Sequence, residues 1–256
     1  MTRPVAIVTG GRRGIGLAIA TALAEAGFDL AIIDLRELEP EGTESVVSRV
    51  KALGADVIYL QWDLADLDAH RAVIERIVEE FGRLDCVVNN AGIAPVLRGD
   101  FLDLSPENFD RIIATNLRGT IFFTQAAVRA MLRLASSGQR TIINVTSVSA
   151  AMTSPERLDY CISKAGLSAF TQGLALRLAQ SEIAVFEVRP GIIRTEMTAG
   201  VADKYDALIK GGLVPMRRWG EAGDVGSICA SLARGSFAFA TGSVIEAGGG
   251  LAISRL

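Results

Sequence analysis

Apolar runs alternate with helical patterns along the chain. Residues 5–8 form a continuous apolar run, a glycine-rich turn follows, and an Ala-rich helical pattern spans residues 17–26 before Gly27. Short apolar runs bounded by turn residues are typical of buried strands, whereas an apolar period near 3.6 residues is typical of helices. The beginning of the chain therefore predicts a strand, a turn and a helix.

The same order recurs along the rest of the chain. Further strands are predicted at residues 30–33, 57–60, 84–88, 141–145, 185–188 and 243–246. Further helices are predicted at about residues 41–53, 69–81, 106–134 and 155–181. Apolar strands that each lead into a helix are typical of a parallel sheet with helices on both faces. The predicted fold class is α/β, a doubly wound parallel sheet in three layers, α/β/α.

The chain has 256 residues, a length that one α/β domain accommodates. No Ser/Pro-rich linker, repeat or low-complexity tract divides it, and its least regular part spans residues 191–220. We therefore predict a single domain over residues 1–256, with a substrate-loop insertion at about residues 191–220.

Composition and charge exclude several classes of protein. Hydrophobic residues make up 50% of the chain and charged residues 21%, which is a globular composition. The formal net charge of −3 provides no basic field for a polyphosphate, so no nucleic-acid partner is expected. Charged residues interrupt the apolar stretches before they reach the roughly 18 residues of a membrane span. We therefore expect no membrane association, and no secretion signal in residues 1–4.

Three Cys residues are present, without a CxxC pair. This number and spacing indicate neither a disulfide framework nor a zinc site, and they fit a reducing, cytoplasmic location. His70 is the single histidine, and without a second ligand it is expected to be a surface residue. No metal site is predicted.

The turn after the first strand is rich in glycine. Its sequence is Thr9-Gly10-Gly11-Arg12-Arg13-Gly14-Ile15-Gly16. Glycines at these positions permit a tight turn, a close approach of backbone to phosphate, and a close helix–strand contact, so the helix start can hold a pyrophosphate. An ordinary strand–helix turn is the alternative interpretation of the same residues.

Asp34 ends the second predicted strand, 18 residues after Gly16, near the spacing of a ribose-binding carboxylate. A carboxylate there accepts hydrogen bonds from the ribose hydroxyls and repels a 2′-phosphate, which favours NAD over NADP. Arg13 and Arg36 argue the other way, because a guanidinium near the ribose binds that phosphate.

Tyr160 and Lys164 are four residues apart in a predicted helix and so share one face. A lysine ammonium favours a tyrosinate, and lowering the tyrosine pKa by roughly three units takes about 4 kcal/mol, which the lysine and an oxidised nicotinamide supply jointly. Tyr160 is then a usable acid or base. The alternative is a structural tyrosine with a surface lysine one turn further along.

Ser147 follows the strand at 141–145 and precedes Tyr160 by 13 residues. The carboxyl edge of a doubly wound sheet, where this strand ends, is the place where such sheets bind ligands. With these residues the chain resembles the short-chain dehydrogenase/reductase family over essentially its whole length. The matching motifs are TGxxxGxG at 9–16, NNAG at 89–92, Asn116, Ser147, and YxxxK at 160–164.

The resemblance implies a Rossmann fold and a catalytic set of Asn116, Ser147, Tyr160 and Lys164. It further implies contacts with the dinucleotide from Gly10, Arg12, Arg13, Gly14, Ile15, Gly16, Asp34, Asp63, Leu64, Asn90, Ala91, Gly92, Tyr160, Lys164, Pro190, Gly191, Ile193 and Thr195. Hydride then passes between nicotinamide C4 and a carbonyl or secondary alcohol, with Tyr160 as acid or base. Asn116 organises a water that links Lys164 to solvent.

Residues 148–159 and 196–220, which select substrate in this family, identify no ligand by themselves. The chain resembles 3-oxoacyl-[acyl-carrier-protein] reductases, which implies a 3-oxoacyl thioester, but NAD-dependent sugar, polyol or hydroxy-acid dehydrogenases share the same features. A non-catalytic dinucleotide-binding protein is the alternative from another functional class. The family also implies assembly into a homotetramer or a homodimer.

Overall fold

A parallel sheet of seven strands forms the middle of the molecule, seen in a computed structural model that describes residues 3–38, 45–96, 98–135 and 138–255. The strands are β1 (Val5–Thr9), β2 (Asp29–Asp34), β3 (Val57–Gln61), β4 (Cys86–Asn89), β5 (Arg140–Val145), β6 (Ile183–Pro190) and β7 (Val244–Ala247). Their order is β3-β2-β1-β4-β5-β6-β7, and every neighbouring pair is parallel. The predicted doubly wound Rossmann-type sheet is confirmed.

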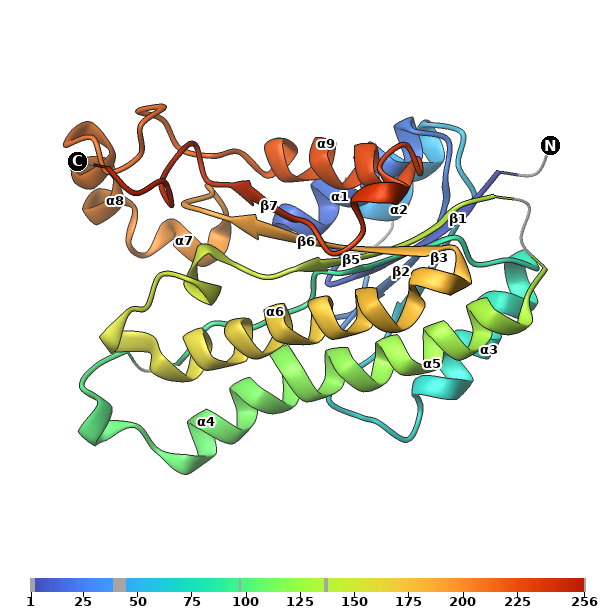
Figure 1. Ribbon diagram of the computed structural model, residues 1–256, viewed down its shortest axis with the longest axis horizontal. Helices are drawn as coiled ribbons and strands as arrows, with labels where there is room; N and C mark the ends of the chain where they lie inside the picture. Colours follow the sequence, from blue (N-terminus) through green and yellow to red (C-terminus); the bar gives the residue numbers. More distant parts are fainter. Residues whose placement is uncertain (1–2, 39–44, 97, 136–137, 256) are drawn as a thin grey trace.

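Helices cover both faces of this sheet (Figure 1). They are α1 (Gly14–Glu25), α2 (Val46–Ala52), α3 (His70–Phe81), α4 (Pro106–Ile113), α5 (Thr120–Arg133), α6 (Leu158–Leu178), α7 (Glu196–Ala199), α8 (Ala202–Lys210) and α9 (Ala222–Ala233). Helices α1, α2 and α9 lie on one face, whereas α3, α5 and α6 lie on the other. This arrangement gives three layers, α/β/α.

Alternation along each strand divides the core into two apolar clusters. In β1, Ala6 and Val8 pack with the side chains of α1 and α9, whereas Ile7 packs with those of α3 and α5. Successive side chains of a strand point to opposite faces, so a strand in the middle of a covered sheet is apolar at every position. The unbroken apolar runs seen in the sequence therefore reflect burial on both faces.

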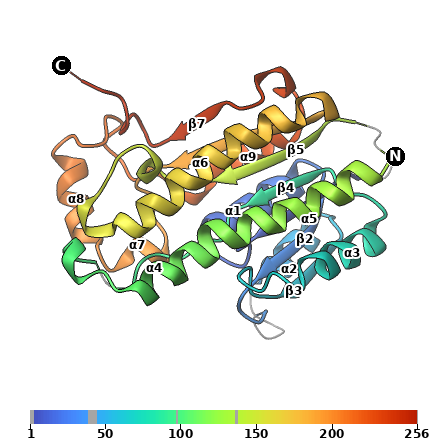
Figure 2. The ribbon, with the colours of Figure 1, turned by 60° about the horizontal axis from the view of Figure 1, so that its bottom comes forward.

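The predicted helical region 106–134 is one continuous rod made of three parts. Between α4 and α5 the residues Ala114–Gly119 form a π-helical segment. In Figure 2, α4 and α5 run end to end alongside α6. The π segment contains Asn116, whose side chain is fully buried. Such π segments are rare and occur frequently at functional sites.

Four helices depart from the sequence prediction. Helix α9 was not predicted, and the insertion at 191–220 contains α7 and α8. Helix α2 begins at Val46, capped by Ser45, and residues 41–44 of the predicted helix lie outside the described residues. The sequence of α9, AGDVGSICASLA, contains Gly and Ser in place of strong helix formers. Tertiary packing against α1 stabilises it.

The contact between α1 and α9 depends on Gly226. A Cβ atom added at Gly226 would lie 2.7 Å from the carbonyl oxygen of Ala18, in α1. Real side chains do not approach a backbone oxygen this closely, so any larger residue forces the two helices apart.

Among the described residues, none of the helices has both the length and the apolar character that a membrane span requires.

We predict that Gly226→Ala destabilises the protein by about 1–3 kcal/mol, because the added methyl group overpacks the α1–α9 contact. Gly223→Ala, in the first turn of the same helix, is the matched control. An added Cβ there meets no atom within 4 Å, so we expect a neutral or slightly stabilising change. Urea denaturation of both variants measures the difference in free energy of unfolding. Equal effects of the two substitutions would contradict this account of the contact.

Candidate active site

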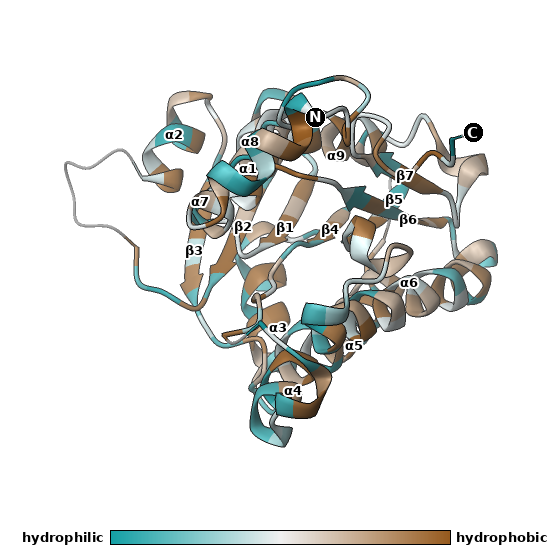
Figure 3. Cartoon of the chain, turned by 90° about the vertical axis from the view of Figure 1, so that its left-hand side faces the viewer, coloured by the Kyte–Doolittle hydropathy of each residue, from teal (hydrophilic) through white to brown (hydrophobic). Residues whose placement is uncertain are grey.

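A cleft of about 650 Å³ lies along the carboxyl edge of the sheet. The loops that follow β1, β2, β3, β4, β5 and β6 form its wall, together with α6 and α7. This is the side of the molecule that faces the viewer in Figure 3. Strand order reverses between β1 and β4, so the loops after these two strands lead to opposite faces and leave a crevice between them.

The structure brings nearly all of the predicted site residues together. The cleft is lined by Gly10, Arg12, Arg13, Gly14, Ile15, Gly16, Asp34, Asp63, Leu64, Asn90, Ala91, Gly92, Ser147, Tyr160, Lys164, Pro190, Gly191, Ile193 and Thr195. Asn116 is the exception among the predicted residues, because it lies behind the cleft wall.

Asn90 joins the turn after β1 to the turn after β4. Its side-chain amide donates hydrogen bonds to the carbonyl oxygens of Thr9 and Gly10, both at 3.0 Å. The hydroxyl of Thr9 in turn accepts from the backbone N–H groups of Asn90 and Ala91, at 3.1 and 3.0 Å. Four hydrogen bonds therefore hold the two turns in register at the point where the strand order reverses.

The glycine turn fits a group that approaches the backbone closely. Gly10 has a φ of 65°, and an added Cβ there would lie 2.9 Å from the Cα of Ala91. A Cβ on Gly16 would collide with the carbonyl oxygen of Gly10. At the start of α1, Arg13 makes no side-chain cap, and the first turn has no acidic residue. The N–H groups of this turn therefore form a site for an anion such as a pyrophosphate.

Asp34 is fixed at the end of β2 by backbone donors. Its carboxylate accepts hydrogen bonds from the N–H groups of Arg12 and Arg36, each at 3.2 Å, and lies 3.9 Å from the Nε atom of Arg12. The guanidinium of Arg13 forms an ion pair with Glu196 across the cleft. The guanidinium of Arg13 is thus engaged by a carboxylate.

Tyr160, Ser147 and Lys164 meet at the other end of the cleft. Burial raises the pKa of Tyr160, and its hydrogen bond with Ser147 and the charges of Arg157 and Arg98 oppose that shift. In the chain alone the pKa of this phenol is therefore raised, whereas the sequence predicts a lowering by Lys164 together with a bound nicotinamide. Desolvation outweighs the cations of the chain, because removing a tyrosinate from water is costly.

Lys164 is a buried lysine, 4% exposed, and not the surface residue of the alternative interpretation. Its Nζ atom donates a hydrogen bond to the carbonyl oxygen of Val145 at 3.1 Å and lies 5.8 Å from the centroid of the Tyr160 ring. Burial lowers the pKa of Lys164 to about 8, and the charge of Glu187 opposes this shift. The ammonium is therefore held beside the phenol in a position where its charge is only partly stabilised.

Asn116 supports the loop after β4. Its Oδ1 atom accepts from the N–H of Ile93 at 2.8 Å, and its Nδ2 atom donates to the carbonyl oxygen of Ile93 at 3.0 Å. An added Cβ on Gly92 would lie 3.3 Å from Oδ1 of Asn116 and 3.5 Å from Nζ of Lys164. Gly92 thus separates the two polar groups.

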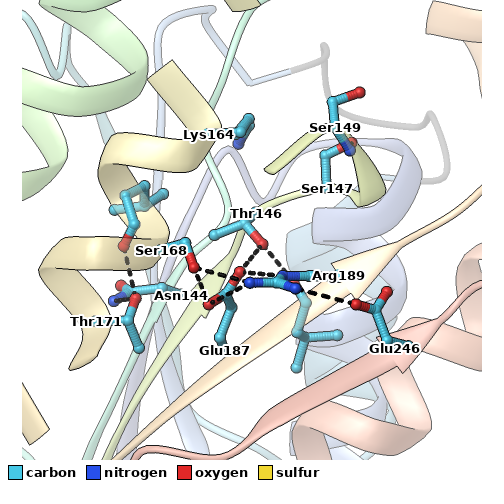
Figure 4. Close-up of polar contacts among 12 residues, drawn as sticks. Asn144, Thr146, Ser147, Ser149, Lys164, Ser168, Thr171, Glu187, Arg189 and Glu246 are labelled. Carbon is cyan, nitrogen blue, oxygen red and sulfur yellow. Dashed lines mark hydrogen bonds and ion pairs between the residues drawn. The ribbon is translucent and has the colours of Figure 1, made fainter. Parts of the chain in front are cut away.

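A buried carboxylate, which the sequence analysis missed, lies behind Ser147 and Lys164 (Figure 4). Glu187 is fully buried and accepts hydrogen bonds from Thr146 at 2.7 Å, Ser168 at 2.7 Å and Nε of Arg189 at 2.6 Å. Thr146 directly precedes Ser147, and Ser168 is one helical turn after Lys164. Glu187 therefore ties the strand end that carries Ser147 to the helix that carries Lys164.

The sequence contains a signal for one pair of this network, Glu187 and Arg189. Glu187 and Arg189 are two residues apart in an otherwise apolar strand, and residues at that spacing share one face of a strand. Arg189 also donates to Glu246 of β7 at 3.1 Å. Acidic and basic residues at this spacing inside a covered sheet indicate a buried ion pair, whereas the bonds from Thr146 and Ser168 come from other elements and have no such signal.

His70 is buried, 2% exposed, so the prediction of a surface histidine is wrong. Its Nε2 atom lies 3.1 Å from the carbonyl oxygen of Leu64, and its ring contacts those of Trp62 and Phe123 edge to face. Burial lowers the pKa of His70, which favours the neutral imidazole. His70 supports the Leu64 segment of the cleft wall from behind.

A family model described as enoyl-(acyl carrier protein) reductase matches residues 10–252. The chain is 37% identical to the 3-oxoacyl-[acyl-carrier-protein] reductase of Staphylococcus aureus over 249 residues, which are 96% of this chain and 97% of that protein. It is 34% identical to versicolorin reductase 1 of Aspergillus parasiticus over 260 residues, covering 96% and 95% of the two chains. A crystal structure of 3-oxoacyl-[acyl-carrier protein] reductase from Brucella melitensis in complex with NAD is 61% identical, with a TM-score of 0.96 and full coverage of both chains.

We predict that Glu187→Ala destabilises the protein by about 3–5 kcal/mol, since it leaves the largely buried guanidinium of Arg189 without its main partner. Glu246→Ala is the matched control. It removes the other carboxylate on the same guanidinium, but Glu246 is 38% exposed, so we expect a cost below about 1 kcal/mol. Chemical denaturation of both variants at neutral pH gives the comparison. A larger loss for Glu246→Ala would contradict the importance of the buried partner.

Proposed function

The chain belongs to the short-chain dehydrogenase/reductase family of NAD(P)-dependent oxidoreductases, and from this premise we propose that it transfers hydride between NAD and a 3-oxoacyl or 3-hydroxyacyl substrate. One observation carries the proposal: Ser147, Tyr160 and Lys164 line the same cleft as the glycine turn and Asp34. The names of the similar proteins support the acyl substrate. The NAD in the Brucella structure supports the cofactor.

The cleft residues fit a dinucleotide along its whole length. We propose that the first turn of α1 holds the pyrophosphate and that Asp34 binds the ribose hydroxyls. Asp63 and Leu64 then contact the adenine, whereas Pro190, Gly191, Ile193 and Thr195 surround the carboxamide. Bound NAD supplies the hydride acceptor or donor for the reaction. The Asn90-Ala91-Gly92 segment lies between these two ends and permits a close backbone approach.

The chain's own residues provide the proton and hold the reacting oxygen. We propose that Ser147 donates a hydrogen bond to the substrate carbonyl oxygen and that Tyr160 donates the proton as this oxygen becomes an alcohol. Lys164, held by Val145, places a positive charge beside the phenol and favours the tyrosinate that results. Asn116 fixes the Ile93 backbone and, in this proposal, organises a water through which Lys164 passes a proton to solvent. Oxidation reverses these steps.

A sugar, polyol or hydroxy-acid dehydrogenase remains the second candidate function. The position of Asp34 favours it, because NAD-linked enzymes commonly work in the direction of oxidation. A non-catalytic binding protein has no need of Ser147, Tyr160 and Lys164 in one cleft, and their arrangement argues against that class. We further propose a cytoplasmic enzyme that assembles as a homotetramer or a homodimer, as its family resemblance implies.

We predict that Tyr160→Phe lowers kcat by about 10²–10⁴-fold, because it removes the group that donates the proton. NADH binding, measured by fluorescence titration, should change little. Tyr59→Phe is the matched control, since Tyr59 lies outside the cleft lining and its hydroxyl donates to the backbone oxygen of Arg36. Turnover by Tyr160→Phe at the wild-type rate would refute the assigned role.

We predict that the wild-type enzyme prefers NADH to NADPH and that Asp34→Ala raises the NADPH/NADH ratio of kcat/KM by about tenfold or more. The substitution removes the charge that repels a 2′-phosphate and leaves Arg12 beside the ribose position. The two ratios of kcat/KM are measured with one carbonyl substrate. A wild-type preference for NADPH would show that the arginines, rather than Asp34, decide the cofactor.

A further inference from the structure

Three arginines line the end of the cleft that contains Tyr160. They are Arg98 in the loop after β4, Arg111 in the last turn of α4, and Arg157 at the start of α6. None of the three forms an ion pair with any residue that the structure describes. Three guanidinium groups therefore face one cavity without a carboxylate partner in the described chain.

The arginines come from different elements that are held against one another. The N–H of Gly99 donates a hydrogen bond to the carbonyl oxygen of Glu156 at 3.3 Å, which joins the Arg98 loop to the segment that carries Arg157. Arg111 and Thr115 are one helical turn apart, and both line the cleft, so this face of the α4 rod points to the same space. The Arg98 loop and the Arg157 segment are thus joined through their backbones, and α4, which carries Arg111, packs against α6.

Arg157 lies beside the reacting group. Its guanidinium carbon is 5.7 Å from the centroid of the Tyr160 ring. The charges of Arg157 and Arg98 both favour the ionised phenol, which places both guanidinium groups within electrostatic range of Tyr160. A substrate whose carbonyl oxygen meets Ser147 and Tyr160 therefore has positive charge close to the carbons next to that carbonyl.

The acidic residues of the cleft do not balance this charge. Asp34 lies beside Arg12, Glu196 is paired with Arg13, and Asp63 accepts from the N–H of Ala65. A neighbouring pocket of about 240 Å³, which Arg98 also lines, contains four carboxylates, those of Asp100, Asp103, Glu156 and Asp159, and none of them forms an ion pair with Arg98 in the described chain. Glu156 lies 4.0 Å from Lys204, and Asp159 accepts from Asn108 and from the N–H of Tyr160. The positive groups of the cleft lining therefore outnumber its carboxylates, and an excess of one charge sign in a cleft concentrates ligands of the opposite sign.

We propose that Arg98, Arg111 and Arg157 bind an anionic group of the substrate and thereby select negatively charged oxo or hydroxy compounds. This inference rests on the proposed function, and it names the substrate class of the same site. Guanidinium groups bind carboxylate and phosphate oxygens through paired hydrogen bonds. The anion is either the carboxylate of a free oxo acid or a phosphate on the carrier of a thioester, and both present the same oxygen chemistry.

Four substrates with the same reacting ketone separate these possibilities. Acetoacetate carries a carboxylate, and acetoacetyl-coenzyme A carries phosphates. Methyl acetoacetate and the N-acetylcysteamine thioester of acetoacetate carry no charge. The readout is the ratio of kcat/KM for each anionic substrate to that for its neutral partner, measured for the wild type, Arg157→Gln, Arg98→Gln and Arg111→Gln. Thermal unfolding checks that each variant is folded.

We expect the wild type to prefer at least one anionic substrate, and each Gln variant to lower that ratio about 10- to 100-fold. Arg157→Lys should restore part of it, since the charge returns without the planar fork. Arg71→Gln is the matched control, because it removes one exposed arginine on α3, outside the cleft lining, and should leave the ratio unchanged. A preference for acetoacetate indicates that the cluster binds a carboxylate, and a preference for acetoacetyl-coenzyme A indicates that it binds a phosphate.

The outcomes separate this inference from the proposed function. The inference is overturned if the wild type reduces the neutral substrates and shows no preference for the anionic ones. It is also overturned if the Gln variants lose kcat/KM equally on anionic and neutral substrates. In both cases the proposed oxidoreductase activity still stands. If none of the four substrates is reduced, the proposed acyl substrate is wrong. Calorimetric titration of the NADH-loaded enzyme with acetoacetate and with inorganic phosphate then decides the inference, since binding must occur in the wild type and weaken in Arg157→Gln. Absence of binding overturns it.

Discussion

The structure depends on the hydrogen bonds that join the turns after β1 and β4. Strand order reverses at this pair, so the chain leaves β1 towards one face of the sheet and leaves β4 towards the other. A gap between the two turns would expose the ends of both strands. Asn90 and Thr9 close that gap with reciprocal bonds, and Gly10 and Ala91 come too close for a side chain between them. The same geometry leaves a crevice above the turns for a ligand.

A second constraint is the burial of charge behind the reacting end of the cleft. Lys164 is almost fully enclosed, which weakens its hold on a proton, and the Val145 carbonyl and the Glu187 carboxylate compensate in part. Glu187 is itself stabilised by Arg189, Thr146 and Ser168. Buried ion pairs of this kind contribute little net stability but strongly oppose rearrangement, because breaking one leaves an uncompensated charge. The strand end at Ser147 and the helix at Lys164 are held at a fixed separation.

The arginines at the Tyr160 end of the cleft make the charge at this end differ from the charge at the Asp34 end. At the other end of the cleft, Asp34 lies beside backbone donors and Arg12. At the Tyr160 end, Arg98, Arg111 and Arg157 leave positive charge directed into the cavity. Desolvation raises the pKa of the Tyr160 phenol, and the charges of Arg157 and Arg98 offset part of that shift.

The sequence by itself determined the sheet, the glycine turn and the polar residues at strand ends, because these follow from local patterns. Apolar runs predict the strands, glycines that tolerate a positive φ predict the turn, and a four-residue spacing places two side chains on one helix face. Only the tertiary structure decided five other features. Helix α9 is stable through its contact with α1, so its own propensity does not reveal it. His70 is buried by aromatic rings that are distant in sequence, including Phe123. Asn116 lies behind the wall because a π segment turns it towards Ile93. The Glu187 network and the arginine cluster join residues from separate elements, and no spacing along one segment encodes how charges from different elements meet in space.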